Sequence, residues 1–170
     1  MSQELTQEYL KSILNYDPET GIITRIKSSG RIKKGVRFGS YDNGYLRAKI
    51  NGKSYLVHRV AFLMHYGYLP ETIDHINGIR DDNRISNIRP STNGQNSMNH
   101  PTRSDNKSGI KGVHFNKEFK KWCAYISINN KRIHLGYFKY IDDAESAVKE
   151  ARIKYHGEFA NHGEFRNDIS

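Results

Sequence analysis

The pattern of apolar and polar residues in the first part of the chain predicts two short helices. Apolar residues between Leu5 and Leu14 recur at helical spacing, and Thr6 is placed to cap the start of this helix. The apolar run from His58 to Tyr66 predicts a buried helix that ends at Gly67. No apolar run approaches the roughly 20 residues that a membrane-spanning helix needs, so we expect no membrane partner.

Between these helices the pattern is that of short strands. Strands are expected at residues 22–26, around 36–38, and at 45–50 and 53–57. The last two should pair as a hairpin, because Asn51-Gly52 accepts the positive φ angles of a two-residue turn.

Residues 73–100 are polar, rich in Asn, Asp and Arg, and have little periodicity. A loop-dominated stretch inside a compact module usually has a functional reason. The segment 101–109 (PTRSDNKSG) then has the composition of a linker.

A β-β-β-α pattern follows the linker. Strands are predicted at 111–115, 122–128 and 132–135, with a turn at 129–131. The apolar face of the next helix consists of Ala144, Ala147, Val148, Ala151 and Tyr155. We therefore expect an α+β protein with an N-terminal module (1–100), a linker (101–109) and a C-terminal module (110–170), the last a three-stranded antiparallel sheet packed on one helix.

Composition limits the partners and the metal chemistry. The 170-residue chain has a formal net charge of +9, which favours a polyanionic partner. From Arg103 to Lys139 there are nine lysines and arginines against two acidic residues, although charge alone would equally fit a merely solvated surface. The single cysteine, Cys123, excludes an intramolecular disulfide and zinc sites built on two or four cysteines. The charged N-terminal helix does not resemble a signal peptide, so we expect a cytoplasmic protein.

Candidate chemistry lies in residues 73–96. Asp74 and His75 are adjacent, and two asparagines, Asn87 and Asn96, follow them. Hydrolysis of a phosphodiester needs a base near neutral pH, which an imidazole supplies, and a hard cation that binds carboxylate and amide oxygens. An isolated Asp-His pair is more often structural, so this pattern alone is weak.

The same stretch resembles the HNH nuclease motif of phage homing endonucleases. The matching pieces, in chain order, are His58-Arg59, Gly67 to Pro70, Asp74 to Gly78, Asp82-Asn83-Arg84, Asn87-Ile88-Arg89, Thr92 and Gln95-Asn96. The resemblance extends upstream through the turn from Tyr16 to Gly21 and covers nearly all of residues 5–100. It implies a ββα-metal unit, in which hairpin strands carry the Asp-His pair and the middle Asn and a helix brings the last ligand.

The resemblance also assigns roles. It implies that His75 is the general base, that Asn87 orients this histidine, and that Asp74 and Asn96 bind one divalent ion, Mg²⁺ or Mn²⁺. Asn96 stands where many members have a third histidine, which points to a hard, oxygen-ligated ion.

For three further residues in this region the sequence leaves two alternative roles open. His58 lies either near the site or at a helix start as a structural histidine, which is the favoured reading. Arg84 and Arg89 either contact phosphate or form salt bridges that pin the loop.

Residues 108–162 resemble the DNA-binding domain of plant ethylene-response factors, which also occurs in phage and mobile-element nucleases. The matching segments are SGIKGVHF (108–115), KWCAYI (121–126), RIHLGYF (132–138) and HGEFAN (156–161). In that family the sheet enters the major groove and the helix supports it from behind.

Strand alternation then divides the side chains. If Ala124, Ile126 and Ile128 face the helix, the opposite face is free for DNA. The expected DNA-binding residues are Lys111, Lys120, Lys121, Tyr125, Ser127, Arg132 and His134. Tyr125 and His134 could instead be ordinary exposed strand residues, and Trp122 is either core, the favoured reading, or a plug against the DNA backbone.

Together these patterns predict a site-directed DNA endonuclease of the homing type, from a phage or mobile element, that acts on double-stranded DNA as a monomer. The alternative is a non-catalytic DNA-binding regulator with a degenerate HNH fold, against which the retention of all four motif residues argues. RNA binding is a third reading, and the sheet lacks the paired stacking aromatics of common RNA-binding sheets.

Overall fold

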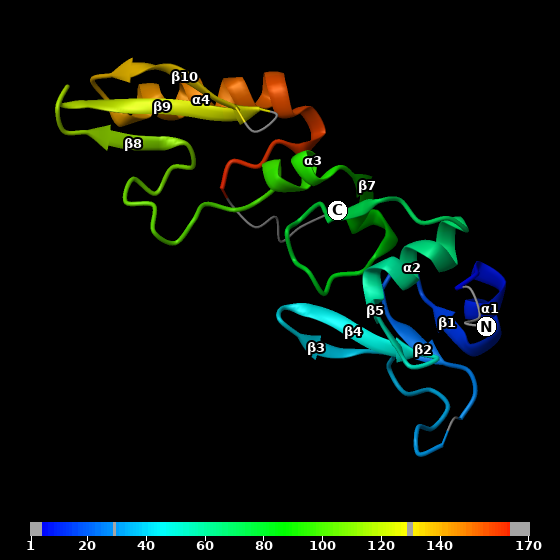
Figure 1. Cartoon of the computed structure of the whole chain (residues 1–170). Helices are drawn as coiled ribbons and strands as arrows, with labels where there is room; N and C mark the ends of the chain where they lie inside the picture. The colour runs from blue at the N-terminus through cyan, green and yellow to red at the C-terminus, as the bar shows by residue number, and fades with distance from the viewer. Residues whose placement is uncertain (1–4, 29, 129–130, 164–170) are drawn as a thin grey trace. The chain divides into compact units, whose positions relative to one another are not determined.

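The chain is described by a computed structural model that covers residues 5–28, 30–128 and 131–163. The described residues form two compact units, of which the first ends at Pro90 and the second begins at Ser91 (Figure 1). Residues 101–109, expected to be a linker, belong to the second unit, and the turn expected at 129–130 lies outside the described residues.

The two helices expected in the first unit are present. Helix α1 (Gln7–Ile13) begins after Thr6, whose side chain accepts a hydrogen bond from the Tyr9 backbone N–H at 3.2 Å. Helix α2 (Val57–Tyr66) ends at Gly67, which has a φ of 80°.

The strands of the first unit form three small sheets. Strands β1 (Leu14–Tyr16) and β2 (Ile23–Arg25) pair with each other, and β3 (Ser40–Asp42), β4 (Tyr45–Ile50) and β5 (Lys53–Leu56) form a sheet in the order β3-β4-β5. Strands β6 (Thr72–His75) and β7 (Ile88–Ser91) form the third. The β4-β5 hairpin turns at Asn51 and Gly52, both with positive φ, as predicted.

The strand predicted around residues 36–38 is wrong. Arg37 makes only an isolated bridge to Thr24, and the strand begins at Ser40. Gly39 intervenes with a φ of 111°, a conformation that interrupts a strand. A Cβ atom at this glycine would lie 2.7 Å from the Val57 side chain, so the chain must turn here to pass the start of α2.

Helix α2 is the centre of the first core. Seven of its residues are buried: Val57, His58, Val60, Ala61, Phe62, Leu63 and Met64. They pack with the buried Leu10, Leu14, Ile23, Phe38 and Ile88 from the surrounding elements. Burial of His58 in this helix is unusual for a polar side chain.

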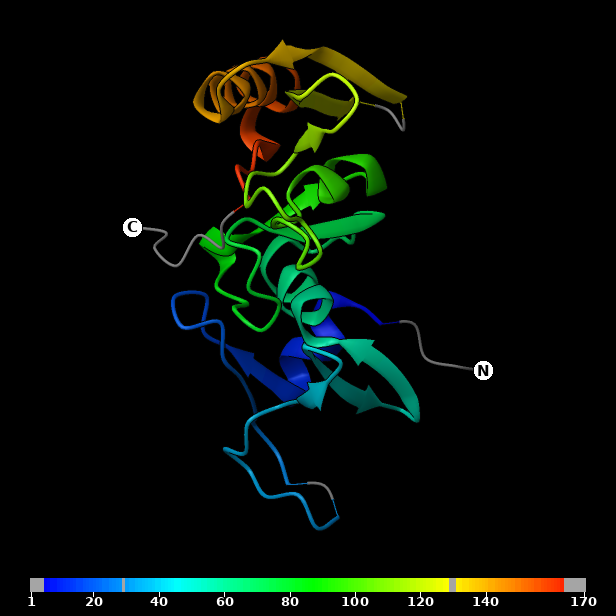
Figure 2. The same cartoon turned by 90° about the vertical axis from the view of Figure 1, so that its left-hand side faces the viewer.

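The second unit is a sheet and a helix preceded by a short helix. It contains α3 (Asn93–Met98), β8 (Val113–Asn116), β9 (Lys121–Ile128), β10 (Lys131–Phe138), α4 (Ile141–His156) and the 3₁₀ turn η2 (Gly157–Phe159). The three strands are antiparallel in the order β10-β9-β8, and α4 runs along one face of the sheet (Figures 1 and 2). The α+β class and the three-stranded sheet packed on one helix are thus confirmed.

Packing of this unit settles two expectations. Trp122 packs against the core of Val113, Ala124, Ala144 and Val148, so the core reading of this tryptophan is correct. Tyr155, expected on the apolar face of the helix, is 48% exposed. The buried face instead continues through Arg152 and His156, which a hydrophobic pattern cannot reveal because both side chains are polar.

In the part of the chain that the structure describes, no helix has the length and apolar character of a membrane span.

Candidate active site and nucleic-acid interface

Strand β6 ends with the two residues on which the proposed chemistry depends. Its last three residues are all buried, and the exposed fractions are 3% for Asp74 and 6% for His75. Neighbouring side chains of a strand point to opposite faces, so each of these two polar groups faces a different, closed environment. A buried polar side chain must find partners within the protein.

Asp74 is paired with Arg89 of β7. Its Oδ2 atom accepts hydrogen bonds from Arg89 Nε at 3.0 Å and Nη2 at 2.9 Å. The side chain of Arg89 is only 13% exposed, so this ion pair is largely shielded from water. Of the two readings of Arg89, the structure therefore contains the salt bridge.

His75 contacts a residue that was not among the expected site residues. Its Nε2 atom lies 3.2 Å from Oδ1 of Asn83, whose side chain is 1% exposed. Burial lowers the pKa of His75 below its ordinary value, although the Asn83 hydrogen bond and the nearby Asp74 charge act in the opposite direction. The ring is therefore neutral at pH 7, the form that a general base requires. Asn83 belongs to the Asp-Asn-Arg piece of the motif, which is the signal in the sequence that could have revealed it.

His58 and Tyr45 enclose the His75 ring. The rings of His58 and His75 meet edge to face with centroids 4.9 Å apart, and the Tyr45 ring centroid lies 6.3 Å from that of His75. Burial lowers the pKa of His58 to about 3, so it too is neutral. The structure therefore has His58 buried at the start of α2, as the favoured interpretation expected, and also places its ring beside that of His75.

Asn87 holds the loop that follows His75. It lies at the end of the 3₁₀ turn η1 (Ile85–Asn87), directly before β7. Its Oδ1 accepts from the Asn77 backbone N–H at 3.0 Å, and its Nδ2 donates to the Asp82 carbonyl at 2.7 Å. These contacts fix the backbone on both sides of the loop, and the described hydrogen bonds of the Asn87 side chain are to this backbone and not to the His75 ring.

Arg84 closes the same loop. Its guanidinium donates to both carboxylate oxygens of Asp82, at 2.8 Å from Nε and 2.6 Å from Nη2. This pairing lowers the pKa of Asp82. The structure thus contains the loop-pinning form of Arg84 as well.

Asn96 is part of the second unit. It lies in α3, which Thr92 starts with a reciprocal capping box to Gln95. Its side chain is half-buried.

The donor chemistry fits a hard, sparsely liganded ion. Among residues 5–28, 30–128 and 131–163, no group of three or more His, Cys, Asp or Glu side chains could hold a metal. The sequence proposes instead one carboxylate and one amide oxygen, which suits an ion that keeps most of its waters, as Mg²⁺ does. Asp74 Oδ2 accepts from the Arg89 guanidinium, so a metal ion at this oxygen would have to replace that cation.

In the second unit, the sheet face opposite α4 gathers several of the expected DNA-binding residues. Tyr125 pairs across the strands with His134, and Ser127 with Arg132, so all four side chains share this face. The Arg132 guanidinium lies over the Tyr125 ring, 4.2 Å from its centroid. Arg132 and Tyr125 also line a hollow of about 740 Å³, together with His114, Lys117, Arg103 and Lys107.

Lysines of this unit behave in two ways. Lys120 and Lys121 are exposed at the β8–β9 turn. Lys111, expected to bind DNA, instead donates to the backbone carbonyls of Met98 at 2.8 Å, His100 at 2.5 Å and Asn161 at 3.3 Å. Burial lowers its pKa to about 8, which leaves it charged at pH 7. Its ammonium is therefore an internal clamp, and the expectation that it contacts DNA is corrected.

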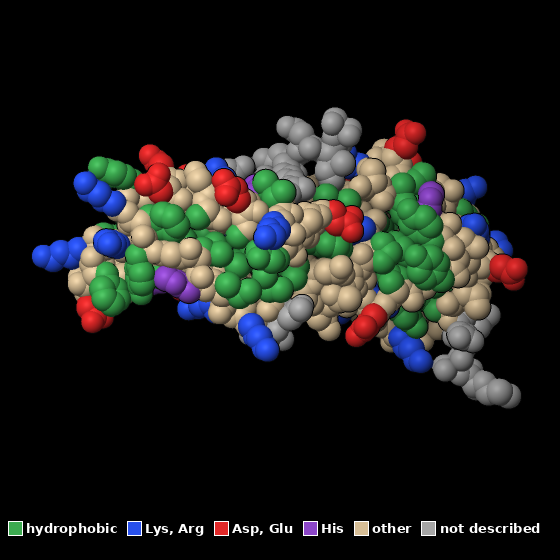
Figure 3. Space-filling view, turned by 90° about the horizontal axis from the view of Figure 1, so that it is seen from above, with side chains coloured by type: hydrophobic (Ala, Val, Ile, Leu, Met, Phe, Trp, Pro, Cys, Tyr) green, Lys and Arg blue, Asp and Glu red, His purple; other side chains and the backbone are tan. Residues whose placement is uncertain are grey.

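On the face shown in Figure 3, lysine and arginine side chains project at separate points, with hydrophobic side chains between them. Such a surface offers both charge for phosphates and apolar area for contact, unlike a uniform basic patch.

Comparison with known proteins shows that the residues proposed for catalysis and metal binding lie within a recognised domain. Residues 55–98 match the family model of the HNH endonucleases, and this range includes Asp74, His75, Asn87 and Asn96. The chain is also 30% identical over 88 residues to Protein 3.8 of Escherichia phage T7, an alignment that covers 52% of this chain and 72% of that protein.

Proposed function

We propose that this chain, which belongs to the family of Protein 3.8 of Escherichia phage T7 and carries an HNH endonuclease domain, is a DNA endonuclease. It would hydrolyse phosphodiester bonds of double-stranded DNA. The observation that carries the proposal is the state of His75: a buried, neutral imidazole held at Nε2 by Asn83, in the residue that follows Asp74 in β6. Such a ring is suited to take a proton from the attacking water.

The proposed metal ligands are Asp74 and Asn96, and the proposed ion is Mg²⁺ or Mn²⁺. The assignment of Asn96 rests on the sequence motif. When bound, a divalent ion would stabilise negative charge on the phosphoryl and leaving oxygens. Asn87 would keep the loop after His75 in place, and Arg84 and Arg89 would hold the two acidic residues with which they pair.

The second unit is proposed to grip the DNA through the sheet face of Tyr125, Ser127, Arg132 and His134, with Lys120 and Lys121 at its edge. The resemblance to the ethylene-response-factor domain and the basic hollow on this face support the proposal. A homing role in a phage belongs to the same proposal, and the likeness to a phage protein supports the phage origin. A monomeric state and a place in the host cytoplasm are also part of the proposal.

The direct test is cleavage of a supercoiled plasmid library carrying genomic inserts. With Mg²⁺ we expect conversion to nicked or linear forms whose ends carry 5′-phosphate and 3′-hydroxyl groups, and with EDTA no conversion. Stable DNA binding by the wild-type protein without cleavage under any divalent ion would favour the non-catalytic regulator instead.

Replacement of Arg132 by alanine tests the proposed grip. Loss of one phosphate-neutralising charge should weaken binding and make the plot of log affinity against log salt less steep by about one unit. Lys154→Ala is the matched control, because it removes one exposed charge from α4 on the other side of the sheet. Equal effects of the two changes in a gel-shift titration would show that this sheet face is not the contact surface.

A further inference from the structure

The turn from Tyr16 to Gly21 and the segment Asp82-Asn83-Arg84 both belong to the sequence motif, yet the chemistry above assigns the turn no role. In the structure they pack on each other. The Tyr16 hydroxyl donates to the Asn83 carbonyl at 2.8 Å, and the Ile85 backbone N–H donates to the Pro18 carbonyl at 2.9 Å. The turn is therefore a support for the backbone at Asn83.

Gly21 shows how close this support is. A Cβ atom at Gly21 would lie 2.4 Å from the backbone nitrogen of Arg84 and 2.5 Å from the carbonyl carbon of Asn83. Glycine also has the φ of 71° that this turn needs. Both the lack of a side chain and the backbone angle thus permit the turn to reach the Asn83 peptide.

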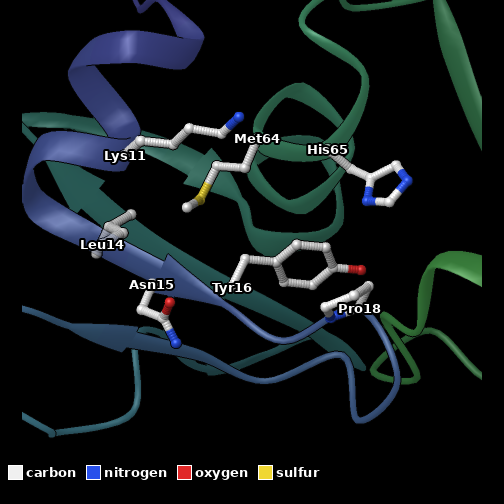
Figure 4. Close-up of a pocket in the computed structure, with 7 residues that line it drawn as sticks. All are labelled: Lys11, Leu14, Asn15, Tyr16, Pro18, Met64 and His65. Carbon is white, nitrogen blue, oxygen red and sulfur yellow. The ribbon is translucent and has the colours of Figure 1, made fainter.

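The Tyr16 side chain that contacts Asn83 also lines a pocket. The pocket, of about 390 Å³, lies between β1 and the end of α2. Figure 4 shows the Tyr16 ring extending across it, with the hydroxyl on the side of Pro18 and His65. Burial raises the pKa of this hydroxyl, so it remains a protonated donor at any physiological pH.

The Asn83 amide can in principle sit in two orientations. With Oδ1 toward His75, as found, Nε2 carries the proton and Nδ1 keeps its lone pair. In the reverse orientation Nδ2 would donate to Nε2, the proton would sit on Nδ1, and neither ring nitrogen could take a proton from water. Only the orientation found in the structure, with Oδ1 toward His75, leaves a ring nitrogen of His75 able to act as a base.

This orientation has a cost that argues for its role. The Asn83 Nδ2 atom is buried and has no hydrogen-bond partner among the described residues. A buried donor that is left without an acceptor destabilises the folded protein. A buried donor without a partner in a functional site needs an explanation. Here the explanation is that the same orientation of the Asn83 amide turns its Oδ1 toward His75 Nε2 as an acceptor.

We infer that Asn83 is a positioning residue for His75: its side-chain oxygen accepts the Nε2 proton, fixes the tautomer, and leaves Nδ1 as the atom that takes the proton from water. The turn from Tyr16 to Gly21 holds Asn83 in register for this contact. The inference rests on the proposed function for its catalytic meaning, but the tautomer itself is a property of the free protein.

The experiment is therefore made without metal or DNA. In the full-length protein with ¹⁵N-labelled histidine, two-dimensional NMR distinguishes the two neutral tautomers by the shifts of their ring nitrogens, and a His75→Gln sample identifies the His75 signals. We expect the Nε2–H form in the wild type and in Asn83→Asp, which keeps an acceptor oxygen. In Asn83→Ala we expect a mixture of tautomers.

Asn77→Ala is the matched control. Asn77 is a fully buried asparagine of the same loop, and its side chain donates to Asp82 at 2.7 Å. Its loss should destabilise the loop and keep the Nε2–H form. A wild-type protein with Nδ1–H, an unchanged tautomer in Asn83→Ala, or the same mixture in Asn77→Ala would each overturn the inference.

Cleavage gives the second readout. Loss of a group that orients a site residue typically costs 10- to 100-fold, so we expect a decrease of about that size in Asn83→Ala and partial rescue in Asn83→Asp. Tyr16→Phe should fall between the wild type and Asn83→Ala, whereas Tyr9→Phe, which removes the hydroxyl bonded to Asn51, should not differ from the wild type. Equal rates for Tyr16→Phe and Tyr9→Phe would remove the turn from the inference. A wild-type protein that does not cut, with the Nε2–H tautomer present, would contradict the proposed function alone.

Discussion

Replacing His75 with alanine should slow DNA cleavage by about 100- to 10,000-fold, the usual contribution of a general base. The side chain removed is buried next to Asp74 and does not lie on the sheet proposed to bind DNA. Affinity in a gel shift should therefore change little. Rates from plasmid nicking under single-turnover conditions, at a fixed Mg²⁺ concentration, provide the measurement.

Two further variants make this result interpretable. The His75 ring packs on His58, so alanine leaves a cavity that could unfold the site. His75→Gln retains a polar side chain of similar length and should be equally inactive with a smaller loss in melting temperature. His65→Ala removes an exposed histidine of α2 and should cut normally. A His75→Gln protein that is folded and cuts at the wild-type rate would mean that another group takes the proton.

Replacing Arg89 with methionine should lower the free energy of unfolding by about 3–5 kcal/mol, the cost of removing one partner of a buried ion pair. Asp74 would lose two charge-assisted hydrogen bonds while it remains 3% exposed. Urea denaturation at neutral pH, without divalent ions, would measure the loss. Arg47→Met is the matched control, because its pair with Asp42 is about half exposed and should contribute less than about 1 kcal/mol.

The same variant also tests Asp74 as a metal ligand. If a divalent ion can take the place of the guanidinium, Mg²⁺ should restore part of the lost stability, since a ligand that binds only the folded state stabilises it. The double variant Asp74→Asn/Arg89→Met should be less destabilised than the two single effects together, and it should not respond to Mg²⁺. Recovery of the same size in the double variant would exclude Asp74 as the ligand.

Much of the fold could be predicted because its signals are local. Asn51-Gly52 specifies a turn, Thr6 and Gly67 mark helix ends, and strand alternation correctly separated Tyr125 and Ser127 from Ala124 and Ile126. The strand misplaced at 36–38 was wrong for a non-local reason. Gly39 turns the chain to clear Val57, and Val57 is remote in sequence.

For the candidate site too, the local features could be predicted from the sequence and the non-local contacts could not. The sequence motif placed Asp74 and His75 together because they are neighbours in the chain. It did not reveal that Asn83 contacts the His75 ring, since that contact depends on how the loop folds back and on support from Tyr16. Lys111 and Arg132 looked alike as basic residues of one module, but only the folded chain shows that one ammonium is used internally.

The clamp made by Lys111 has a practical meaning for dissecting the protein. A C-terminal fragment that started near residue 108 would lack Met98 and His100, whose carbonyls are two of the three acceptors of the Lys111 ammonium. Such a fragment would bind DNA poorly for want of a stable fold, and the result would be mistaken for evidence on recognition. Expression from Ser91 onward retains all three carbonyls and keeps folding separate from affinity.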